Sequence, residues 1–311
     1  MRNMDIVYPA KLSPGDLIGI TALASYADPV EMVRSTTYFT QMGLRVEIGQ
    51  SIFREYGYLA GTDEERAKEL NDMFQNPEIK AIICARGGYG TARIADLLDY
   101  DCIKHNPKIF WGFSDITFLH QAIYKNTGLI TFHGPMLSSL NDRSLHPLTL
   151  AGYQQLFTPT AIEYTEEIST LTSIVEGTAS GAVVGGNLSL IVSSLSTPYE
   201  IDTRNKLLLI EEICEEPYRI DRMLRQLLQA GKLTEASGII VGNFHECVPN
   251  KNKSSFTCEE VIIEYLKKAD RPAMAGFDIG HCSPNIAIPL GLEAELSTAK
   301  KSLIWKKPAV I

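Results

Sequence analysis

The chain lacks the features that mark membrane, secreted and nucleic-acid-binding proteins. No apolar run in its 311 residues approaches the roughly 20 residues of a membrane-spanning helix. The segment from Met1 to Pro14 has no positively charged stretch followed by an apolar core, so no secretion signal is expected. A formal net charge of −8 gives no general attraction to nucleic acid or to an anionic membrane. We therefore expect a cytoplasmic protein with no nucleic-acid or membrane partner.

Cysteine is sparse, and its spacing does not suggest a metal or disulfide framework. The six cysteines include no C-x-x-C pair, and several lie in apolar runs. This pattern is typical of free thiols in a reducing cytosol. His245, Glu246 and Cys247 are neighbours, but side chains one and two positions apart do not converge like a tetrahedral ligand set. We expect no bound metal.

Length and composition predict a globular protein of about two domains. Apolar residues make up 45% of the chain and charged residues 21%, which is enough apolar material for a sizeable core. The pattern changes near residue 150, and residues 157–173 are rich in Thr, Ser and Glu with poor apolar periodicity. We expect an N-terminal domain over residues 1–150, a linker over residues 151–175 and a C-terminal domain over residues 176–311.

Strands and helices alternate between residue 17 and about residue 135. The predicted strands cover residues 17–23, 44–48, 79–84, 108–112 and 129–133, with helical patterns between them. This alternation is typical of a doubly wound, mostly parallel α/β sheet, in which ligands bind at the carboxyl ends of the strands. The second half has strands of more varied character, and we expect a smaller, β-rich α/β domain there.

Ser114 lies between a predicted buried strand and a helical pattern. A serine at such a turn exposes its hydroxyl beside the backbone N–H groups of the helix start, as an activated nucleophile requires. The surrounding residues do not match the pentapeptide G-x-S-x-G, because Asp115 and Ile116 follow the serine. Serine is also a good helix N-cap. The turn alone leaves both interpretations open.

A second turn, Arg86-Gly87-Gly88-Tyr89-Gly90, follows the strand 79–84. Its glycines allow a substrate to approach the backbone closely, and it offers free N–H groups and one cation. These features indicate an oxyanion donor or a carboxylate anchor. The spacing matches neither G-x-G-x-x-G nor G-x-x-x-x-G-K-[ST], so a nucleotide cofactor is not expected.

A serine nucleophile also needs a base and an acid that orients it. Glu211 follows the apolar run Leu207–Ile210 of a predicted buried strand, where a charge needs a partner. Of the six histidines, His281 enters a loop just after a predicted strand, and His133 ends another strand. An ordinary hydrogen-bonded loop histidine is the alternative interpretation of His281. Cys282 is a rival nucleophile, although adjacent residues seldom point at each other.

Seven stretches resemble, in order and across nearly the whole chain, the motifs of the LD-carboxypeptidase family of serine peptidases. They are Tyr58–Asp63, Ala85–Gly90, Gly112–Thr117, Thr131–Met136, Gly185–Leu188, Glu211–Glu212 with Pro217–Arg222, and Gly280–Asn285. Each motif is modestly specific alone, but seven in order are very specific together.

The resemblance implies a nucleophile domain followed by a domain that supplies the acid and the base. The implied triad consists of Ser114 as nucleophile, Glu211 as orienting acid and His281 as base. The implied oxyanion hole uses backbone amides, which we place at Gly88 and Asp115. The neighbouring residues Arg86, Gly87 and Tyr89 are our candidates for substrate binding, and we expect Arg86 or another cation to bind the terminal carboxylate.

The implied reaction is release of the terminal D-alanine from murein tetrapeptides during wall recycling, by a cytoplasmic homodimer without cofactor or metal. The residue before D-alanine stays open between lysine and diaminopimelate. One branch of the family, the microcin C self-immunity peptidases, cleaves an aspartyl–adenylate-type amide and has an aromatic-bearing loop. The two tryptophans here, Trp111 and Trp305, lie in a buried strand and the tail, which disfavours stacking on adenine by tryptophan. A ligand-binding protein without chemistry is the third hypothesis.

Overall fold

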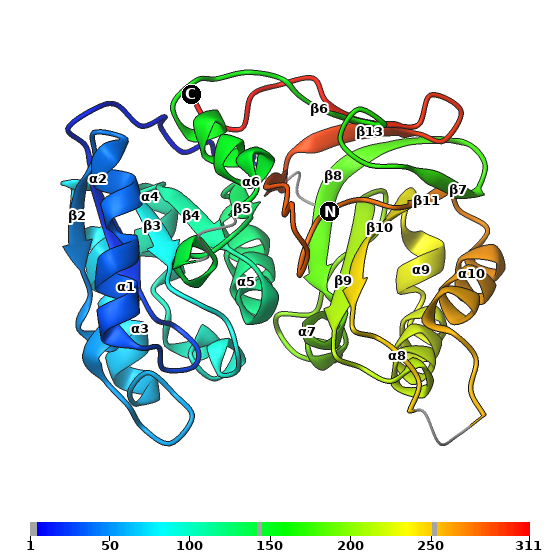
Figure 1. The fold of residues 1–311 in the computed structure, drawn as a ribbon, viewed down its shortest axis with the longest axis horizontal. Coiled ribbons are helices and arrows are strands. Elements are labelled where there is room, and N and C mark those ends of the chain that lie inside the picture. The colour runs from blue at the N-terminus through cyan, green and yellow to red at the C-terminus, as the bar shows by residue number, and fades with distance from the viewer. Residues whose placement is uncertain (1–4, 142–144, 251–253) are drawn as a thin grey trace. The chain divides into compact units, whose positions relative to one another are not determined.

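A computed structural model describes residues 5–141, 145–250 and 254–311, and the chain divides into two compact units (Figure 1). The first unit comprises Met1–Thr160, Ile286–Gly291 and Ala309–Ile311, and the second comprises Ala161–Asn285 and Leu292–Pro308. Residues 286–291 and 309–311 belong to the first unit, although they come after most of the second unit in the chain. The hydrophobic periodicity of the sequence does not indicate this assignment. No helix in the described part of the chain has the length and apolar character that a membrane crossing requires.

The first unit is built on a six-stranded sheet with the order β12-β5-β4-β3-β1-β2. Its strands are β1 (Leu17–Thr21), β2 (Arg45–Ile48), β3 (Ile79–Cys84), β4 (Ile109–Gly112), β5 (Thr131–His133) and β12 (Ile288–Leu290). β1 to β5 are parallel, and β12 adds one antiparallel edge strand. This confirms the predicted doubly wound, mostly parallel sheet. The strand order reverses between β1 and β3, which is where such sheets usually bind ligands.

In the described ranges of the first unit, six helices connect or flank these strands. They are α1 (Pro29–Ser35), α2 (Thr37–Gln41), α3 (Asp63–Gln75), α4 (Tyr100–His105), α5 (Thr117–Thr127) and α6 (Pro147–Ala151). α3 begins with a complete capping box between Thr62 and Glu65. Between Gly90 and α4 the chain forms two 3₁₀ turns, Thr91–Arg93 and Ala95–Leu97. In the core, the ring of Trp111 stacks on that of Tyr153, with 4.6 Å between centroids.

The second unit contains an eight-stranded sheet with the order β6-β14-β13-β8-β9-β10-β11-β7. Its strands are β6 (Ile162–Thr165), β7 (Thr172–Val175), β8 (Thr178–Asn187), β9 (Leu207–Ile213), β10 (Gly238–His245), β11 (Ala273–Ala275), β13 (Glu293–Ser297) and β14 (Ser302–Trp305). β8 to β11 are parallel, and the other strands are antiparallel to their neighbours. The sheet confirms the expected β-rich α/β character.

The stretch 151–175, which the sequence suggested as a linker, contains β6 and β7 at the two edges of this sheet. Each has four residues and is largely unburied. Short edge strands with one solvated side carry Thr, Ser and Glu without a strong apolar pattern. That is why composition alone did not reveal them.

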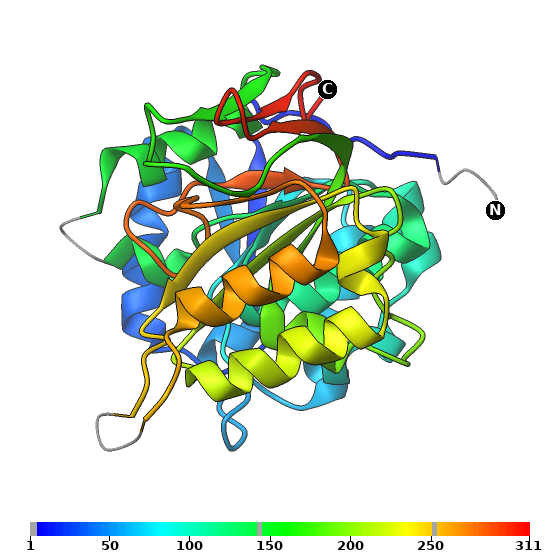
Figure 2. The same cartoon turned by 90° about the vertical axis from the view of Figure 1, so that its right-hand side faces the viewer.

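The second unit, as far as the structure describes it, has four helices: α7 (Leu188–Ser193), α8 (Pro217–Gln229), α9 (Lys232–Glu235) and α10 (Cys258–Ala269). Figure 2 shows α8 and α10 side by side over one face of the sheet. The apolar face of α8 includes Ile220, Leu224 and Leu227, which are all buried. Because α8 is packed in this way, its start keeps a fixed position relative to the carboxyl end of β9.

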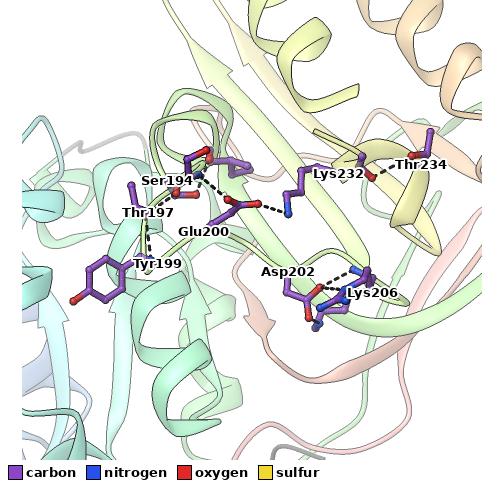
Figure 3. A network of polar contacts seen from close by, with 12 residues as sticks. Ser194, Thr197, Tyr199, Glu200, Asp202, Lys206, Lys232 and Thr234 are labelled. Atoms are coloured by element: carbon purple, nitrogen blue, oxygen red, sulfur yellow. Dashed lines mark hydrogen bonds and ion pairs between the residues drawn. The ribbon is translucent and has the colours of Figure 1, made fainter. Parts of the chain in front are cut away.

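Ion pairs fix the connection between α7 and β9 (Figure 3). Lys232 Nζ of α9 lies 2.6 Å from Glu200 Oε1, and Glu200 Oε2 accepts a hydrogen bond from the backbone N–H of Ser196. Asp202 pairs with Arg204 and Lys206, each at 3.0 Å. The connection is therefore held at both ends, and β9 enters the sheet from an ordered loop.

Candidate active site

Ser114 occupies a strained turn at the carboxyl end of β4. Its backbone φ is +62°, in the left-handed region that serine seldom adopts. A 3₁₀ turn, Ser114–Ile116, leads directly into α5. Outliers of this kind persist where the surrounding structure enforces them, which is typical of a nucleophile at a strand-to-helix turn. The N-cap residues of this turn and of α5 are Phe113 and Ile116, so Ser114 stands at neither cap position, which favours the nucleophile interpretation over the N-cap.

The glycine-rich turn after β3 approaches Ser114 closely. A Cβ added to Gly87 would lie 2.9 Å from Ser114 Cβ and 3.3 Å from the backbone nitrogen of Asp115. Gly88 has a φ of +116°, and a Cβ there would lie 2.4 Å from Oγ of Ser25. The two glycines therefore allow the turn to pass between the nucleophile and the loop after β1.

Ser25 was not a candidate from the sequence. Its Oγ accepts a hydrogen bond from the N–H of Tyr89 at 3.2 Å, and its own N–H donates to the carbonyl of Gly87 at 3.4 Å. Ser25 follows β1, and β1 lies next to β3 in the parallel sheet. This position could have indicated that Ser25 lies near the glycine-rich turn after β3. Ser25 thus supports the turn that carries Gly88.

Arg66 of α3 is fully buried and binds two backbone carbonyls of this region. Its Nη1 donates to the carbonyl oxygens of Leu23 and Gly90, the latter at 3.0 Å. Its Nη2 lies 2.5 Å from Asp63 Oδ1. Arg66 shares the apolar face of α3 with Leu70 and Met73, at helical spacing. The position of Arg66 on the otherwise apolar face of α3 was the feature of the sequence that could have indicated a buried cation.

Asp115 joins the glycine-rich turn to the serine turn from the other side. Its Oδ2 accepts the N–H of Thr91 at 2.8 Å, and Thr91 Oγ1 donates to the Asp115 carbonyl at 2.6 Å. Burial raises the pKa of the Asp115 carboxyl, and the hydrogen bonds from Thr91 oppose that rise. The two proposed oxyanion donors, Gly88 and Asp115, are thus carried by segments that are hydrogen-bonded to each other.

The remaining candidates of the first unit differ in their surroundings. Arg86 Nη1 donates to the carbonyl oxygen of Tyr26 at 2.9 Å and is half-buried. Tyr89 is 52% exposed, and its ring meets that of Tyr58 edge-on at 5.5 Å. His133, which the sequence placed at a strand end, is completely buried in β5.

The second unit brings Glu211 and His281 together. Nδ1 of His281 lies 2.7 Å from Oε2 of Glu211, although the two are 70 positions apart. Glu211 is fully buried within β9, so desolvation raises its pKa, while its hydrogen bond with His281 lowers it. Gly280 has a φ of +109°, and a Cβ there would lie 2.5 Å from Glu211 Oε2. Glycine is therefore required for the His281 loop to reach the carboxylate.

Glu212 points away from Glu211 and has a structural environment of its own. Its carboxylate accepts hydrogen bonds from Asn187 Nδ2, from the N–H and Oγ of Ser189, and from the N–H of Ile213, at 2.6–2.9 Å. Asn187 also caps α7 and pairs with Glu211 in the β8–β9 register. Glu212 thus anchors the start of α7 beside the acid–base pair.

Cys282, the rival nucleophile, is not activated by its surroundings. Burial raises the pKa of the Cys282 thiol to about 12, so it is protonated at neutral pH. All six cysteines are free. Within the described ranges, no three His, Cys, Asp or Glu side chains form a group that could hold a metal ion.

Comparisons with known proteins place these features in a family. Residues 18–134 match the model of the LD-carboxypeptidase N-terminal domain, and residues 180–296 match that of the C-terminal domain. The chain is 54% identical over 299 residues to a Bacillus subtilis protein named "Probable murein peptide carboxypeptidase", covering 95% of this chain and 93% of the relative.

Two solved structures share the fold. The microcin C7 self-immunity protein MccF, in complex with aspartyl sulfamoyl adenosine, superposes with a TM-score of 0.89 at 26% identity, covering 98% of this chain and 100% of that one. The muramoyltetrapeptide carboxypeptidase of Oxalobacter formigenes superposes with a TM-score of 0.82 at 25% identity, covering 94% and 98%.

Proposed function

Because this chain belongs to the LD-carboxypeptidase family of peptidases, we propose that it is a serine-type carboxypeptidase that releases the terminal D-alanine of murein tetrapeptides. The relative that is 54% identical is named for murein peptides, whereas the microcin immunity protein is similar at 26% identity. The difference in identity favours the murein substrate. The proposal includes action in the cytoplasm, during wall recycling, as a homodimer.

The proposed mechanism uses a Ser–Glu–His triad. Ser114 Oγ attacks the carbonyl carbon of the scissile amide while His281 accepts the hydroxyl proton. Glu211 holds the resulting imidazolium through its Nδ1–H. His281 then donates the proton to the leaving amine of D-alanine, and water hydrolyses the acyl-enzyme by the same route.

The backbone N–H groups of Gly88 and Asp115 are the proposed donors to the oxyanion of each tetrahedral intermediate. Preorganised donors of this kind are each worth roughly 10²- to 10³-fold in rate. Arg86, Gly87 and Tyr89 are the proposed contacts for the D-alanine end of the substrate. Arg86 already donates to a backbone carbonyl, and a guanidinium has further N–H groups for a carboxylate.

The observation that carries the proposal is the Glu211–His281 hydrogen bond at 2.7 Å. A fully buried carboxylate that bonds Nδ1 of a half-buried histidine fixes the tautomer and leaves Nε2 as the proton acceptor. A structural histidine does not require a buried anion as its partner. The left-handed φ of Ser114 supports the matching role of nucleophile.

Release of D-alanine from a purified murein tetrapeptide tests this function directly. We expect wild-type protein to release it, Ser114→Ala to lose it with an unchanged circular dichroism spectrum, and Cys282→Ala to keep it. A fluorophosphonate should add to wild type and not to Ser114→Ala, as seen by mass spectrometry. Activity that survives in Ser114→Ala disproves the assignment, and a protein that never forms the adduct returns us to a non-catalytic binding protein.

The microcin-type reaction is the second candidate. Both tryptophans, Trp111 and Trp305, are completely buried, so neither is available to stack on an adenine. Parallel hydrolysis of a murein tetrapeptide and an aspartyl sulfamoyl adenosine compares the two substrates. We expect the tetrapeptide to have the higher kcat/KM. Light scattering of the purified protein tests the proposed homodimer.

A further inference from the structure

The loop that leads to His281 is held by a side chain from the other end of the same sheet. β6 and β11 lie near opposite ends of the strand order β6-β14-β13-β8-β9-β10-β11-β7, and the loop Gly276–Gly280 follows β11. Tyr164 of β6 nevertheless accepts a hydrogen bond at its Oη from the backbone N–H of Asp278, at 2.6 Å. The eight-stranded sheet is therefore curled so far that its first strand meets the loop before the proposed base.

A chain of three hydrogen bonds begins and ends in this loop. Ser169 Oγ lies 2.7 Å from Tyr164 Oη and donates to the carbonyl oxygen of Gly276 at 2.6 Å. Because a carbonyl oxygen can only accept, Ser169 uses its one hydroxyl proton there, and the Tyr164 hydroxyl donates to Ser169. A lone pair of Tyr164 Oη accepts from Asp278. Each hydroxyl proton in the chain thus has one defined acceptor.

The surroundings of Tyr164 suit a fixed and uncharged role. Its side chain is 1% exposed, and its ring meets that of Phe277 edge-on, with 4.9 Å between centroids. Burial raises the pKa of its phenol to about 12, so the hydroxyl keeps its proton at neutral pH. A buried hydroxyl that gives up its hydrogen bonds is costly, so Tyr164 keeps the loop in one position.

The same loop is held again immediately before the proposed base. The carbonyl oxygen of Ile279 accepts from the N–H of Asn243 in β10 at 2.9 Å, and the N–H of Gly280 donates to Asn285 Oδ1 at 3.2 Å. Gly280 adjoins His281 in the chain. The backbone between Asp278 and His281 therefore has little freedom, and a shift at its start is passed on to the imidazole.

We propose that Tyr164 is a positioning residue for His281, on which it acts through the loop Gly276–Gly280 without touching the substrate. The proposal rests on the proposed function, in which His281 accepts and returns a proton. Proton transfer requires the imidazole within hydrogen-bond reach of the reacting groups, whereas substrate binding does not require it. Loss of the Tyr164 hydroxyl should therefore lower kcat and leave KM nearly unchanged.

Tyr164→Phe is the test variant, because it removes the hydroxyl and keeps the ring beside Phe277. A misplacement of about 1 Å costs about 10²-fold in rate, so kcat for D-alanine release should fall by roughly 10- to 10²-fold, with KM within about twofold of wild type. Ser169→Ala should also lower kcat, since it removes both the acceptor of the Tyr164 proton and the donor to Gly276. Ser169→Thr restores a hydroxyl at this half-exposed position and should recover most of kcat.

Tyr265→Phe is the matched control. Tyr265 is also a buried tyrosine of the second unit, and its Oη donates to Asp221 Oδ1 at 2.6 Å, but this hydrogen bond joins α10 to α8. The variant should retain the kcat and KM of wild type. An equal fall in kcat for Tyr265→Phe and Tyr164→Phe, or an unchanged kcat in Tyr164→Phe, overturns the proposal.

The proton on Nδ1 of His281 gives a direct readout of the position of the imidazole. An imidazole N–H that is hydrogen-bonded to a carboxylate resonates far downfield in the proton NMR spectrum, and its absence in Glu211→Gln assigns the signal. The signal should be present in wild type and in Tyr265→Phe, and shifted upfield or broadened in Tyr164→Phe. An unchanged signal in Tyr164→Phe, or a wild type without a signal that Glu211→Gln removes, overturns the proposal whatever the kinetics.

The NMR signal does not depend on turnover, so it separates this proposal from the proposed function. If wild type releases no D-alanine but Tyr164→Phe alters the signal, the reaction is wrong and the positioning of His281 by Tyr164 stands. If wild type releases D-alanine and Tyr164→Phe keeps both kcat and the signal, the proposed function stands and the positioning role is wrong. Thermal unfolding shows whether each variant is folded. Should Tyr164→Phe not fold, Ser169→Ala takes its place under the same criteria.

Discussion

His281 Nδ1 lies 2.7 Å from Glu211 Oε2, and the carboxylate in this pair is completely buried. Next to it in β9, the buried carboxylate of Glu212 accepts from Asn187, Ser189 and the following backbone N–H. The two adjacent glutamates thus have different partners: Glu211 binds the imidazole of His281, and Glu212 binds Ser189 at the start of α7. Substitution of each should have a different consequence.

Glu211→Gln should lower kcat for D-alanine release by roughly 10³- to 10⁴-fold, because an amide does not stabilise an imidazolium and favours the wrong tautomer. It should not lower the melting temperature, because it removes a desolvated charge. Glu212→Gln should instead reduce the free energy of unfolding by about 1–3 kcal/mol, since the amide N–H₂ faces donors in a buried site. Steady-state kinetics and thermal unfolding of both variants measure this. The same loss of activity in both, with equal stability, contradicts the division of roles.

Gly87→Ala should reduce kcat by at least about 10²-fold, because a Cβ at 2.9 Å from Ser114 Cβ displaces the nucleophile. A misplacement of about 1 Å has an effect of this size on catalysis. Gly87 has no positive φ, so the substitution adds little backbone strain. Gly57→Ala is the converse control: its φ is +60°, and nothing lies within 4 Å of an added Cβ. It should cost about 1 kcal/mol of stability and leave kcat unchanged. A fully active Gly87→Ala would place Ser114 outside the catalytic machinery.

Arg66→Lys should lower kcat with little change in KM. A lysine keeps the charge but lacks the planar fork that reaches the carbonyls of both Leu23 and Gly90, so the turn carrying Gly88 is no longer fixed. Exposed Arg93 also pairs with Asp63, at 2.9 Å, and provides the control Arg93→Lys, which should retain most activity. Unfolding in urea reports how far each change affects stability. An equal fall in kcat for both variants would show that catalysis depends on the positive charge near Asp63, and not on the hydrogen bond from Arg66 to the Gly90 carbonyl.

His120 should make the protein sensitive to mild acid. Burial lowers its pKa from 6.5 to about 4, and its Nε2 lies 2.8 Å from the carbonyl oxygen of Gly112 at the end of β4. Between these two values the unfolded chain binds a proton that the folded chain does not. Stability is therefore greatest above pH 6.5 and falls as the pH drops toward 4, by at most about 1.4 kcal/mol per pH unit.

Urea unfolding of wild type and His120→Gln at pH 7.5, 6 and 5 measures the effect. Glutamine can still donate to the Gly112 carbonyl but does not titrate, so the variant should lose less stability on acidification than wild type. Identical pH slopes for the two proteins would rule out His120 as the source of the sensitivity.

Local sequence patterns predicted the elements that carry the candidate site. The apolar runs predicted for β1, β3, β4 and β9 are strands in the structure. These strands could be predicted because their pattern depends only on residues that are close together in the sequence. The strands β6, β7 and β12 escaped prediction, because three- and four-residue strands at sheet edges have too few buried positions to show a pattern.

The sequence by itself determined the chemistry available: a serine at a strand-to-helix turn, a glycine-rich turn, and a glutamate and a histidine after strands. Only the tertiary structure decided which of these groups meet. Glu211 and His281 are hydrogen-bonded across 70 positions, and Arg66 of α3 binds the carbonyl of Gly90, 24 positions away. These contacts follow from strand order and from the approach that Gly280 and Gly87 permit. Strand order and backbone approach are properties of the folded chain, because they depend on packing between segments that are distant in sequence.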